Sequence, residues 1–280
     1  MLSHPDALQA WDEIAPVIAH ARECLLVLDY DGTLAPIVPD PAEAVLPNGA
    51  KKLLDELRRI AGVHVAVVSG RALTDVRQRV GLDLTYAGNH GLEIEGPGIH
   101  FVDEDAAAMA GIVSLVCKDL QGAVAGFPGA FVEGKGLSVS VHSRRVPEED
   151  EGRLAAAVNK VVGRYAEEIA VLPGSRILEI RPRVRSDKGT AARLILRSLG
   201  TESDVLPICV GDDLTDEDMF RRFPKGITVR VGSCAASAAK YCLPAVPEVA
   251  ELLCRIRDLR RQGRRPSRRS RSKAALMRLK

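Results

Sequence analysis

Two aspartates stand directly after a run of apolar residues, and this position suggests chemistry. Residues 25–28 (LLVL) have the composition of a strand buried on both faces, and Asp29-Tyr30-Asp31 follows them. A buried carboxylate is costly unless a positive charge lies beside it. Two carboxylates with one residue between them also repel each other. The sequence therefore predicts a site at this strand end that attracts a cation, with a loop beginning at Gly32.

Three further polar clusters lie at predicted strand ends or helix starts. Ser69-Gly70-Arg71 follows the stretch VHVAVV, Gly211-Asp212-Asp213 follows VLPICV, and Lys188 opens a helix. In an open parallel sheet, ligands bind beyond the carboxyl ends of the strands, so these clusters should meet at one edge. Aspartates after strands can also serve only as caps of turns or helices. That alternative explains one cluster easily, but four clusters in one sheet favour a functional site.

The combined side chains suit phosphoryl transfer with magnesium. Mg²⁺ prefers oxygen ligands and is usually held by a few carboxylates, water and substrate phosphate. Asp29, Asp212 and the backbone carbonyl of Asp31 could supply that set. With Mg²⁺ and Lys188 neutralising the phosphate, Asp29 could attack the phosphorus in line and form an aspartyl-phosphate.

The other groups of these clusters support the same chemistry. Asp31 could protonate the departing oxygen and then activate the hydrolytic water. Ser69 and the neighbouring backbone N–H groups, including that of Gly70, would hold phosphate oxygens. Asp213, which we count among the catalytic residues, and Asp216 would support the metal-bound waters and the lysine.

The order of predicted elements indicates an α/β fold with an insertion. Strands and helices alternate over residues 25–84 and again over 186–232, which implies a Rossmann-like parallel sheet with helices on both faces. Residues 106–180 differ. They give a helix, an alternating stretch FVEGKGLSVSVHSRRV typical of a half-exposed strand, a second helix and a returning strand. We therefore predict a catalytic core of residues 1–105 and 181–259 with an inserted α+β cap at 106–180.

The charge distribution sets the C-terminal segment apart. Residues 260–280 contain ten Lys or Arg and no acid, whereas the rest of the chain has 29 basic and 37 acidic residues, a net charge of −8. A basic segment can bind nucleic acid or an anionic membrane. This one has no aromatic residue among its charges to stack on bases. We predict a flexible, solvated tail without a nucleic-acid partner.

Two further features concern the cellular environment. The chain has no basic-then-apolar leader pattern and no apolar run near the roughly 20 residues that span a bilayer. We therefore expect a cytoplasmic protein without a membrane partner. The six cysteines, at positions 24, 117, 209, 234, 242 and 254, form no CxxC pair or metal-ligand spacing. We expect all six to be reduced, buried thiols.

Several motifs resemble those of known phosphatases. VLDYDGTL, VVSGR, SDKG and GDDLTDEDMF are similar to the motifs of the haloacid dehalogenase-like (HAD) phosphatase superfamily, in the same order and along nearly the whole chain. YAGNHGLEI (86–94), VEGKGLSVSVHSR (132–144) and ILEIRP (177–182) narrow the resemblance to the trehalose-6-phosphate phosphatase family. The cap motif departs from the family pattern at Gly134, where Asp is common, and at Ser143, where an aromatic is usual.

The resemblance implies a substrate and its contacts. It implies Mg²⁺-dependent hydrolysis of trehalose 6-phosphate, the step that follows a trehalose-phosphate synthase. Strand alternation predicts Glu133 and Lys135 on one face of the cap, and the resemblance adds Glu179 as a third contact to the sugar hydroxyls. From the core side it implies further substrate contacts, made by Arg71, Asn89 and His90.

Other functions fit parts of the same pattern. A related HAD phosphatase could act on sucrose phosphate or on mannosyl-3-phosphoglycerate. A non-catalytic sugar-phosphate sensor with a nucleic-acid-binding tail would be a different class of protein. The complete set of Asp29, Asp31, Lys188 and Asp212 argues against the sensor. Glu133 and Lys135 could also form only a solvated ion pair on the surface.

Overall fold

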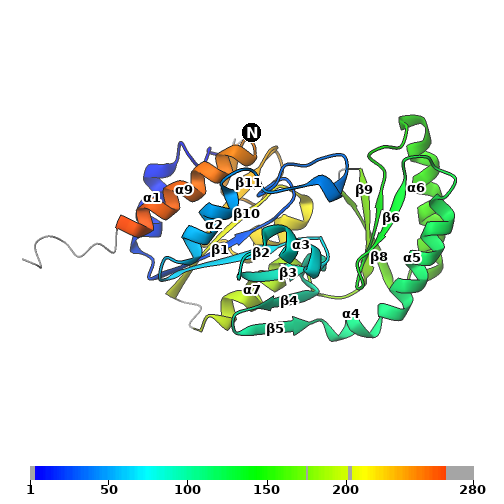
Figure 1. The fold of residues 1–280 in the computed structure, drawn as a ribbon, viewed down its shortest axis with the longest axis horizontal. Helices are drawn as coiled ribbons and strands as arrows, with labels where there is room; N and C mark the ends of the chain where they lie inside the picture. Colours follow the sequence, from blue (N-terminus) through cyan, green and yellow to red (C-terminus); the bar gives the residue numbers. More distant parts are fainter. Residues whose placement is uncertain (1–3, 175, 201–203, 263–280) are drawn as a thin grey trace, which may run out of the picture.

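The computed structural model describes residues 4–174, 176–200 and 204–262, and the larger of its two sheets carries the predicted strand ends (Figure 1). In spatial order, the strands of this eight-stranded sheet are β12 (Tyr241–Leu243), β11 (Ile227–Val231), β10 (Val205–Gly211), β1 (Glu23–Leu28), β2 (Val63–Val68), β3 (Thr85–Gly88), β4 (Glu93–Gly96) and β5 (Ile99–Val102). The first six run parallel, and β4 runs antiparallel to both of its neighbours, β3 and β5. The carboxyl ends of β1, β2 and β10 therefore meet at one edge.

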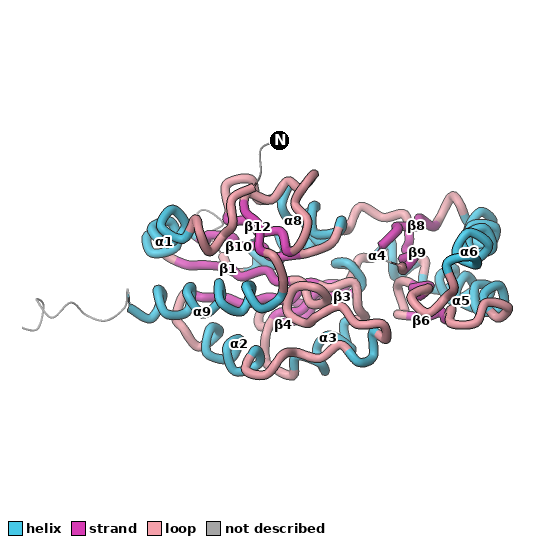
Figure 2. The backbone as a smooth tube through the Cα atoms, turned by 90° about the horizontal axis from the view of Figure 1, so that it is seen from above, coloured by secondary structure: helices cyan, strands magenta, loops and turns pink. Residues whose placement is uncertain are grey.

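Helices cover both faces of this sheet. Along β1, Leu26 and Leu28 pack into one apolar cluster, whereas Leu25 and Val27 pack into another on the opposite face. The first cluster includes side chains of α1 (Trp11–His20), α2 (Ala50–Arg58), α3 (Leu73–Val80) and α9 (Val246–Gln262), and the second those of α7 (Lys188–Ser198) and α8 (Glu217–Arg222). Figure 2 shows α8 on one side of the strands and α2 and α9 on the other. The predicted α/β class is confirmed, because a strand buried on both faces needs apolar residues at every position.

A second, smaller sheet forms what we call the cap. Its strands lie in the order β6 (Phe131–Gly134), β7 (Val139–His142), β9 (Ile177–Pro182) and β8 (Ile169–Gly174). Helices α5 (Ala110–Val124) and α6 (Glu148–Val162) pack on its outer face around a third apolar cluster, and α4 (Glu104–Ala108) leads into it from β5 (Figure 1). Strand β9 runs two residues past the predicted cap boundary at 180, and the exact division into domains stays a prediction.

The alternating stretch FVEGKGLSVSVHSRRV is a hairpin and not one strand. Strands β6 and β7 pair antiparallel, and the turn at residues 135–138, which we call the cap turn, joins them. Gly136 has φ of +80°, a left-handed conformation that glycine adopts without strain. The prediction of one strand through Glu133 and Lys135 is therefore wrong, because Glu133 lies in β6 and Lys135 in the cap turn. Alternation alone cannot distinguish a long strand from two short ones.

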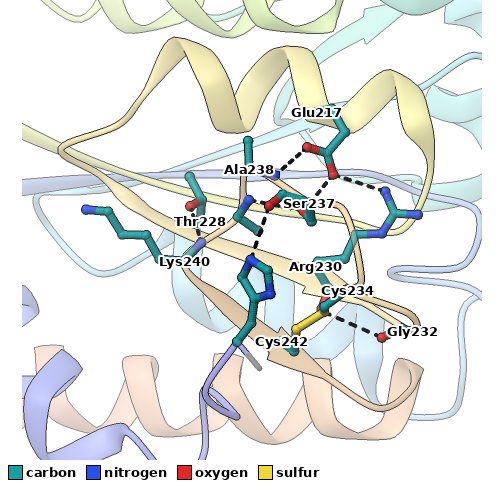
Figure 3. Close-up of a disulfide and its surroundings, with 11 residues drawn as sticks. Glu217, Thr228, Arg230, Gly232, Cys234, Ser237, Ala238, Lys240 and Cys242 are labelled. Carbon is teal, nitrogen blue, oxygen red and sulfur yellow. Dashed lines mark hydrogen bonds and ion pairs between the residues drawn. A yellow bond between two sulfur atoms is a disulfide. The ribbon is translucent and has the colours of Figure 1, made fainter. Parts of the chain in front are cut away.

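The expectation of six reduced cysteines is wrong for two of them. Cys234 and Cys242 form a disulfide across the loop between β11 and β12, with Cα atoms 6.4 Å apart (Figure 3). The remaining four are free thiols, at positions 24, 117, 209 and 254. The pairing depends on how β12 folds back beside β11, and spacing in the sequence does not reveal that.

The C-terminal helix includes the first residues of the predicted tail. Helix α9 continues to Gln262, and residues 263–280 lie outside the described part of the chain. Arg260 is only 7% exposed. Its guanidinium donates to the carbonyls of Ile18, Ala21 and Arg22 at 2.7–3.1 Å.

Among the described residues, no helix combines the length and the apolar character needed to cross a bilayer.

Arg260 should therefore stabilise the core, unlike its neighbour. We expect Arg260→Ala to lower the free energy of unfolding by about 2 kcal/mol, because buried carbonyls lose charged donors. Arg261 is a matched control, since its side chain is 49% exposed and pairs with Glu56 at 3.5 Å. Arg261→Ala should cost less than about 1 kcal/mol. Urea unfolding of the two variants measures the difference, and equal losses would contradict the role of Arg260.

Candidate active site

A cavity of about 130 Å³ lies between the carboxyl edge of the large sheet and the cap. Every site residue predicted from the sequence except Asn89 and Asp216 lines it. The core contributes Asp29, Asp31, Ser69, Gly70, Arg71, His90, Lys188, Asp212 and Asp213, and the cap contributes Glu133, Lys135 and Glu179. The structure thus brings together in one place residues that are up to 184 positions apart in the sequence.

Other residues line the cavity that were not among the predicted contacts. They are Ile37, Pro41, His142, Arg144, Ile177 and Thr215. His142 and Arg144 lie in the motif at 132–144, and Ile177 lies in the motif at 177–182. Ile37 and Pro41 belong to the loop after β1, and Ile177 begins β9. Their position depends on how loops fold over the cavity, for which the sequence carries no periodic signal.

Lys188 lies between two carboxylates at the base of the cavity. Its Nζ donates to Oδ1 of Asp29 and to Oδ1 of Asp216, each at 2.7 Å. Lys188 begins α7, whose first turn is fixed by a capping box between Asp187 and Thr190. Burial alone would lower the pKa of Lys188, but the charges of Asp216 and Asp29 raise it above its ordinary value. The lysine is therefore a fixed positive charge in this cluster.

One lysine does not neutralise the carboxylates around it. Oxygens of Asp29, Asp212 and Asp216 lie within 4.8 Å of one another. Burial raises the pKa of Asp29 well above its ordinary value, and burial and the nearby charge of Asp216 raise that of Asp212 to about 7. This excess of negative charge on hard oxygen ligands fits a divalent cation such as Mg²⁺.

The three carboxylates are not equally available to a cation. Oδ2 of Asp216 accepts the backbone N–H groups of Asp212 and Asp213, both at 2.9 Å, while its other oxygen accepts from the lysine. Asp29 and Asp212 therefore have the carboxylate oxygens of this cluster that a cation could bind. Gly32 allows Asp212 to approach the loop after β1, since a Cβ at Gly32 would lie 2.1 Å from Oδ2 of Asp212.

Asp31 is held by an arginine. Nε and Nη2 of Arg71 donate to the two oxygens of Asp31, each at 2.7 Å, in a bidentate pair. Arg71 also donates to Asp75 at 2.8 Å and to the carbonyl of Pro41 at 2.8 Å. Although Arg71 lines the cavity, protein groups occupy its guanidinium, and it fixes the direction of the Asp31 carboxylate.

A second charged cluster faces these groups from the cap. Nζ of Lys135 donates to the carboxylate of Glu179 at 3.1 and 3.2 Å, and Oγ of Ser140 donates to the same carboxylate at 2.8 Å. Burial raises the pKa of Glu179, but the Lys135 ammonium and the contact with His90 outweigh it and hold the pKa well below its usual range. Glu179 is therefore an ionised acceptor.

Glu133 has a separate partner. Nε2 of His142 lies 2.8 Å from Oε2 of Glu133, and the imidazole stacks on Phe131 with ring centroids 4.3 Å apart. Both Glu133 and His142 line the cavity. The stacked ring fixes one oxygen of Glu133, which leaves the other free to accept a hydrogen bond from a ligand.

The comparison with known proteins identifies the family. The family model described as trehalose-phosphatase matches residues 27–246, which include both charged clusters. The chain belongs to the trehalose-phosphatase family. The membership predicted from the motifs is confirmed.

Relatives match this trehalose-phosphatase family member over most of its length. It is 36% identical over 270 residues to the probable trehalose-phosphate phosphatase 4 of Oryza sativa subsp. japonica, and this alignment covers 93% of the chain and 72% of that protein. It is 38% identical over 266 residues to the trehalose-phosphate phosphatase of Mycobacterium tuberculosis, covering 91% of the chain and 66% of the relative. The chain therefore spans about two thirds of the mycobacterial protein.

Solved structures share the fold. A trehalose-6-phosphate phosphatase related protein aligns with a TM-score of 0.75 at 26% identity, over 85% of this chain and 99% of that one. The C-terminal domain of the Candida albicans trehalose-6-phosphate phosphatase aligns with a TM-score of 0.81 at 23% identity, over 92% of this chain and 99% of that domain. The HAD-type fold expected from the sequence is confirmed.

Proposed function

We propose that the protein is a Mg²⁺-dependent phosphatase that hydrolyses trehalose 6-phosphate to trehalose and phosphate, the last step of trehalose synthesis. One observation carries the proposal. A single cavity joins the acid and lysine cluster of the core to the ionised Glu133 and Glu179 of the cap. The first cluster suits a phosphate ester, and the second suits the hydroxyl groups of a sugar. Family membership supports the same reading.

Asp29 is the nucleophile in this proposal. Its carboxylate follows β1, where the amide of Asp29 donates to the carbonyl of Val210 at 3.0 Å and fixes the backbone. One oxygen faces Lys188, and the other can attack phosphorus and form an aspartyl-phosphate. A bound Mg²⁺, held by Asp29, Asp212 and the Asp31 carbonyl, would neutralise charge on the phosphate. The charge of Lys188 opposes the rise in the pKa of Asp29 that burial causes, and a bound Mg²⁺ would act in the same direction.

Asp31 moves the protons, and the loop at residues 69–71 holds the phosphate. Asp31 protonates the sugar oxygen as it leaves and later accepts a proton from the attacking water. Arg71 keeps its carboxylate in the direction of the cavity. Ser69 is 1% exposed, and with the amide of Gly70 it can donate to phosphate oxygens. Asp213 lies at the cavity wall and supports the water ligands of the metal.

Broader assignments follow from this activity. We propose a cytoplasmic enzyme that takes its substrate from a trehalose-phosphate synthase. The basic tail is not needed for the chemistry, because the groups that line the cavity all precede residue 216. That the tail has no nucleic-acid partner stays a prediction, since residues 263–280 lie outside the described part of the chain.

Phosphate release from a panel of sugar phosphates tests the proposal. The purified protein should release phosphate from trehalose 6-phosphate with Mg²⁺ and stop when EDTA is added. Glucose 6-phosphate, sucrose 6-phosphate and mannosyl-3-phosphoglycerate should react more slowly. A preference for one of the last two would assign the chain to a related activity. No release from any of them would favour a sugar-phosphate sensor.

The cap should determine the preference for the sugar. Glu133→Gln should lower kcat/KM for trehalose 6-phosphate, relative to that for p-nitrophenyl phosphate, by about tenfold, the loss of a charged hydrogen bond. The small ester does not reach the cap. Glu149→Gln is the control, because Glu149 lies exposed on α6. Equal losses of kcat/KM on both substrates would mean that Glu133 stabilises the cap rather than binding the sugar. If neither value fell, Glu133 would be only a member of a surface ion pair.

A further inference from the structure

The phosphate loop, residues 69–71, has all three of its carbonyl groups held from outside. The amide of His90 donates to the first carbonyl at 2.9 Å, and the amide of Asn89 donates to the third at 2.7 Å. The middle carbonyl accepts from Nζ of Lys135 at 2.9 Å. Because Lys135 belongs to the cap, one of the three supports of the phosphate loop reaches it across the boundary between cap and core.

Lys135 is positioned by contacts of the cap turn. The amide of Lys135 donates to the carbonyl of Ser138 at 2.9 Å and closes the turn. Oγ of Ser138 donates to Oδ1 of Asn89 at 2.6 Å, and Nδ2 of Asn89 donates to the carbonyl of Lys135 at 3.1 Å. Asn89 and Ser138 are both 0% exposed. The core side chain of Asn89 therefore holds both ends of the cap turn.

The backbone at Asn89 is unusual and well fixed. Asn89 has φ of +50° and His90 has φ of +58°, the left-handed region that asparagine tolerates better than most residues. Such conformations persist where surrounding contacts over-determine them, often at functional sites. Nδ2 of Asn89 also donates to Glu93 at 2.5 Å. These contacts aim the Asn89 amide at the cap and away from the cavity, which it does not line.

The size of the cavity requires the cap to move. Its volume is about 130 Å³, whereas pockets for ligands of ordinary size measure about 300–1,000 Å³. A disaccharide phosphate therefore needs the cap to move relative to the core. The contacts between Asn89 and the cap turn join these two parts.

We propose that Asn89 and Ser138 form a clasp that positions Lys135 between Glu179 and the phosphate loop when the cap closes. The clasp makes the support of the phosphate loop depend on a cap seated on the core. Both are positioning residues, and Asn89 serves this role instead of the predicted contact to the substrate. This inference rests on the proposed function for its substrate and on the hydrogen bonds above for its geometry.

Removing the Ser138 hydroxyl tests the clasp with little change in volume. In Ser138→Ala, the ratio of kcat/KM for trehalose 6-phosphate to that for p-nitrophenyl phosphate should fall about tenfold, because a buried acceptor on Asn89 loses its donor. Asn89→Gly should act in the same direction, and the double variant should lose less than the sum of the two effects. Ser143→Ala is the control, a serine just after β7 whose replacement should leave the ratio unchanged. An unchanged ratio in Ser138→Ala would overturn the proposal, as would additive effects.

A distance measurement separates the clasp from the choice of substrate. Spin labels can be attached at Val17 in the core and Leu115 in the cap, which are 50% and 57% exposed. Electron paramagnetic resonance then measures the distance between the two labels, which reports on the position of the cap. We expect Ser138→Ala to broaden the distance distribution toward longer values, and Ser143→Ala to leave it unchanged. A distribution in Ser138→Ala equal to that of the wild type would overturn the clasp. Failure of the wild type to hydrolyse trehalose 6-phosphate would instead overturn the proposed function. The distance distributions would still show whether the clasp positions the cap.

Discussion

Asp29→Asn should reduce phosphate release to background, a loss of roughly 10⁴-fold or more for a missing nucleophile. An amide cannot form an aspartyl-phosphate, and it is a poor ligand for Mg²⁺. The fold should remain intact, since the variant relieves repulsion among Asp29, Asp212 and Asp216, which lie within 4.8 Å of one another. Steady-state phosphate release and urea unfolding measure the two effects. Activity near that of the wild type would disprove the assignment of the nucleophile.

Two other variants serve as comparisons for Asp29→Asn. Asp31→Asn keeps the backbone carbonyl for the metal but loses proton transfer, so its loss should be about 10²–10⁴-fold. Its dependence of rate on pH should also change. Asp12→Asn replaces an exposed aspartate of α1 and should leave turnover unchanged. A smaller loss in Asp29→Asn than in Asp31→Asn would reverse the two roles.

Lys188→Met should unfold far more easily than the wild type. Lys188 is 3% exposed and is the shared partner of Asp29 and Asp216. Without it these carboxylates are buried next to one another without a compensating charge, which costs about 3–5 kcal/mol. Activity should be lost as well, because the phosphate no longer meets a fixed positive charge. Urea unfolding in EDTA measures the change in stability.

Magnesium and a second lysine provide the controls for this variant. Because Mg²⁺ would bind the same carboxylates, it should restore part of the stability lost in Lys188→Met. Lys240→Met removes an exposed lysine whose Nζ donates to the carbonyl of Gly226 at 2.9 Å, and it should cost about 0.5 kcal/mol or less. If Lys188→Met were as stable as Lys240→Met, the lysine would not be the charge that holds this cluster together.

The sequence predicted the core of the site because strand ends in a parallel sheet converge. Asp29 and Asp212 each follow an apolar run typical of a strand with helices packed on both of its faces. The strands that precede them, β1 and β10, pair in parallel, so the two aspartates lie at the same edge of the sheet. Lys188 was recognisable as the first residue of a helix. These predictions depend on local pattern and on one topological rule, so they needed no knowledge of side-chain packing.

The rest depended on contacts between distant segments. Lys135 lies at the cavity although the single strand predicted for it is a hairpin, because the cap turn is held on the core by Asn89. That Arg71 binds substrate stays a prediction, and its bidentate pair with Asp31 was not predicted. The burial of Arg260 and the pairing of Cys234 likewise follow from tertiary folding. No periodicity in the sequence reports such contacts.

Trapping the phosphorylated residue during turnover tests the central claim most directly. Wild-type protein would be mixed with Mg²⁺ and trehalose 6-phosphate, quenched in acid within one turnover and reduced with borohydride, which converts an aspartyl-phosphate to homoserine. Peptide mass spectrometry should find homoserine at position 29, only when the substrate was present. Homoserine at Asp31 or Asp212, or a phosphorylated histidine with Asp29 unmodified, would contradict the proposed mechanism.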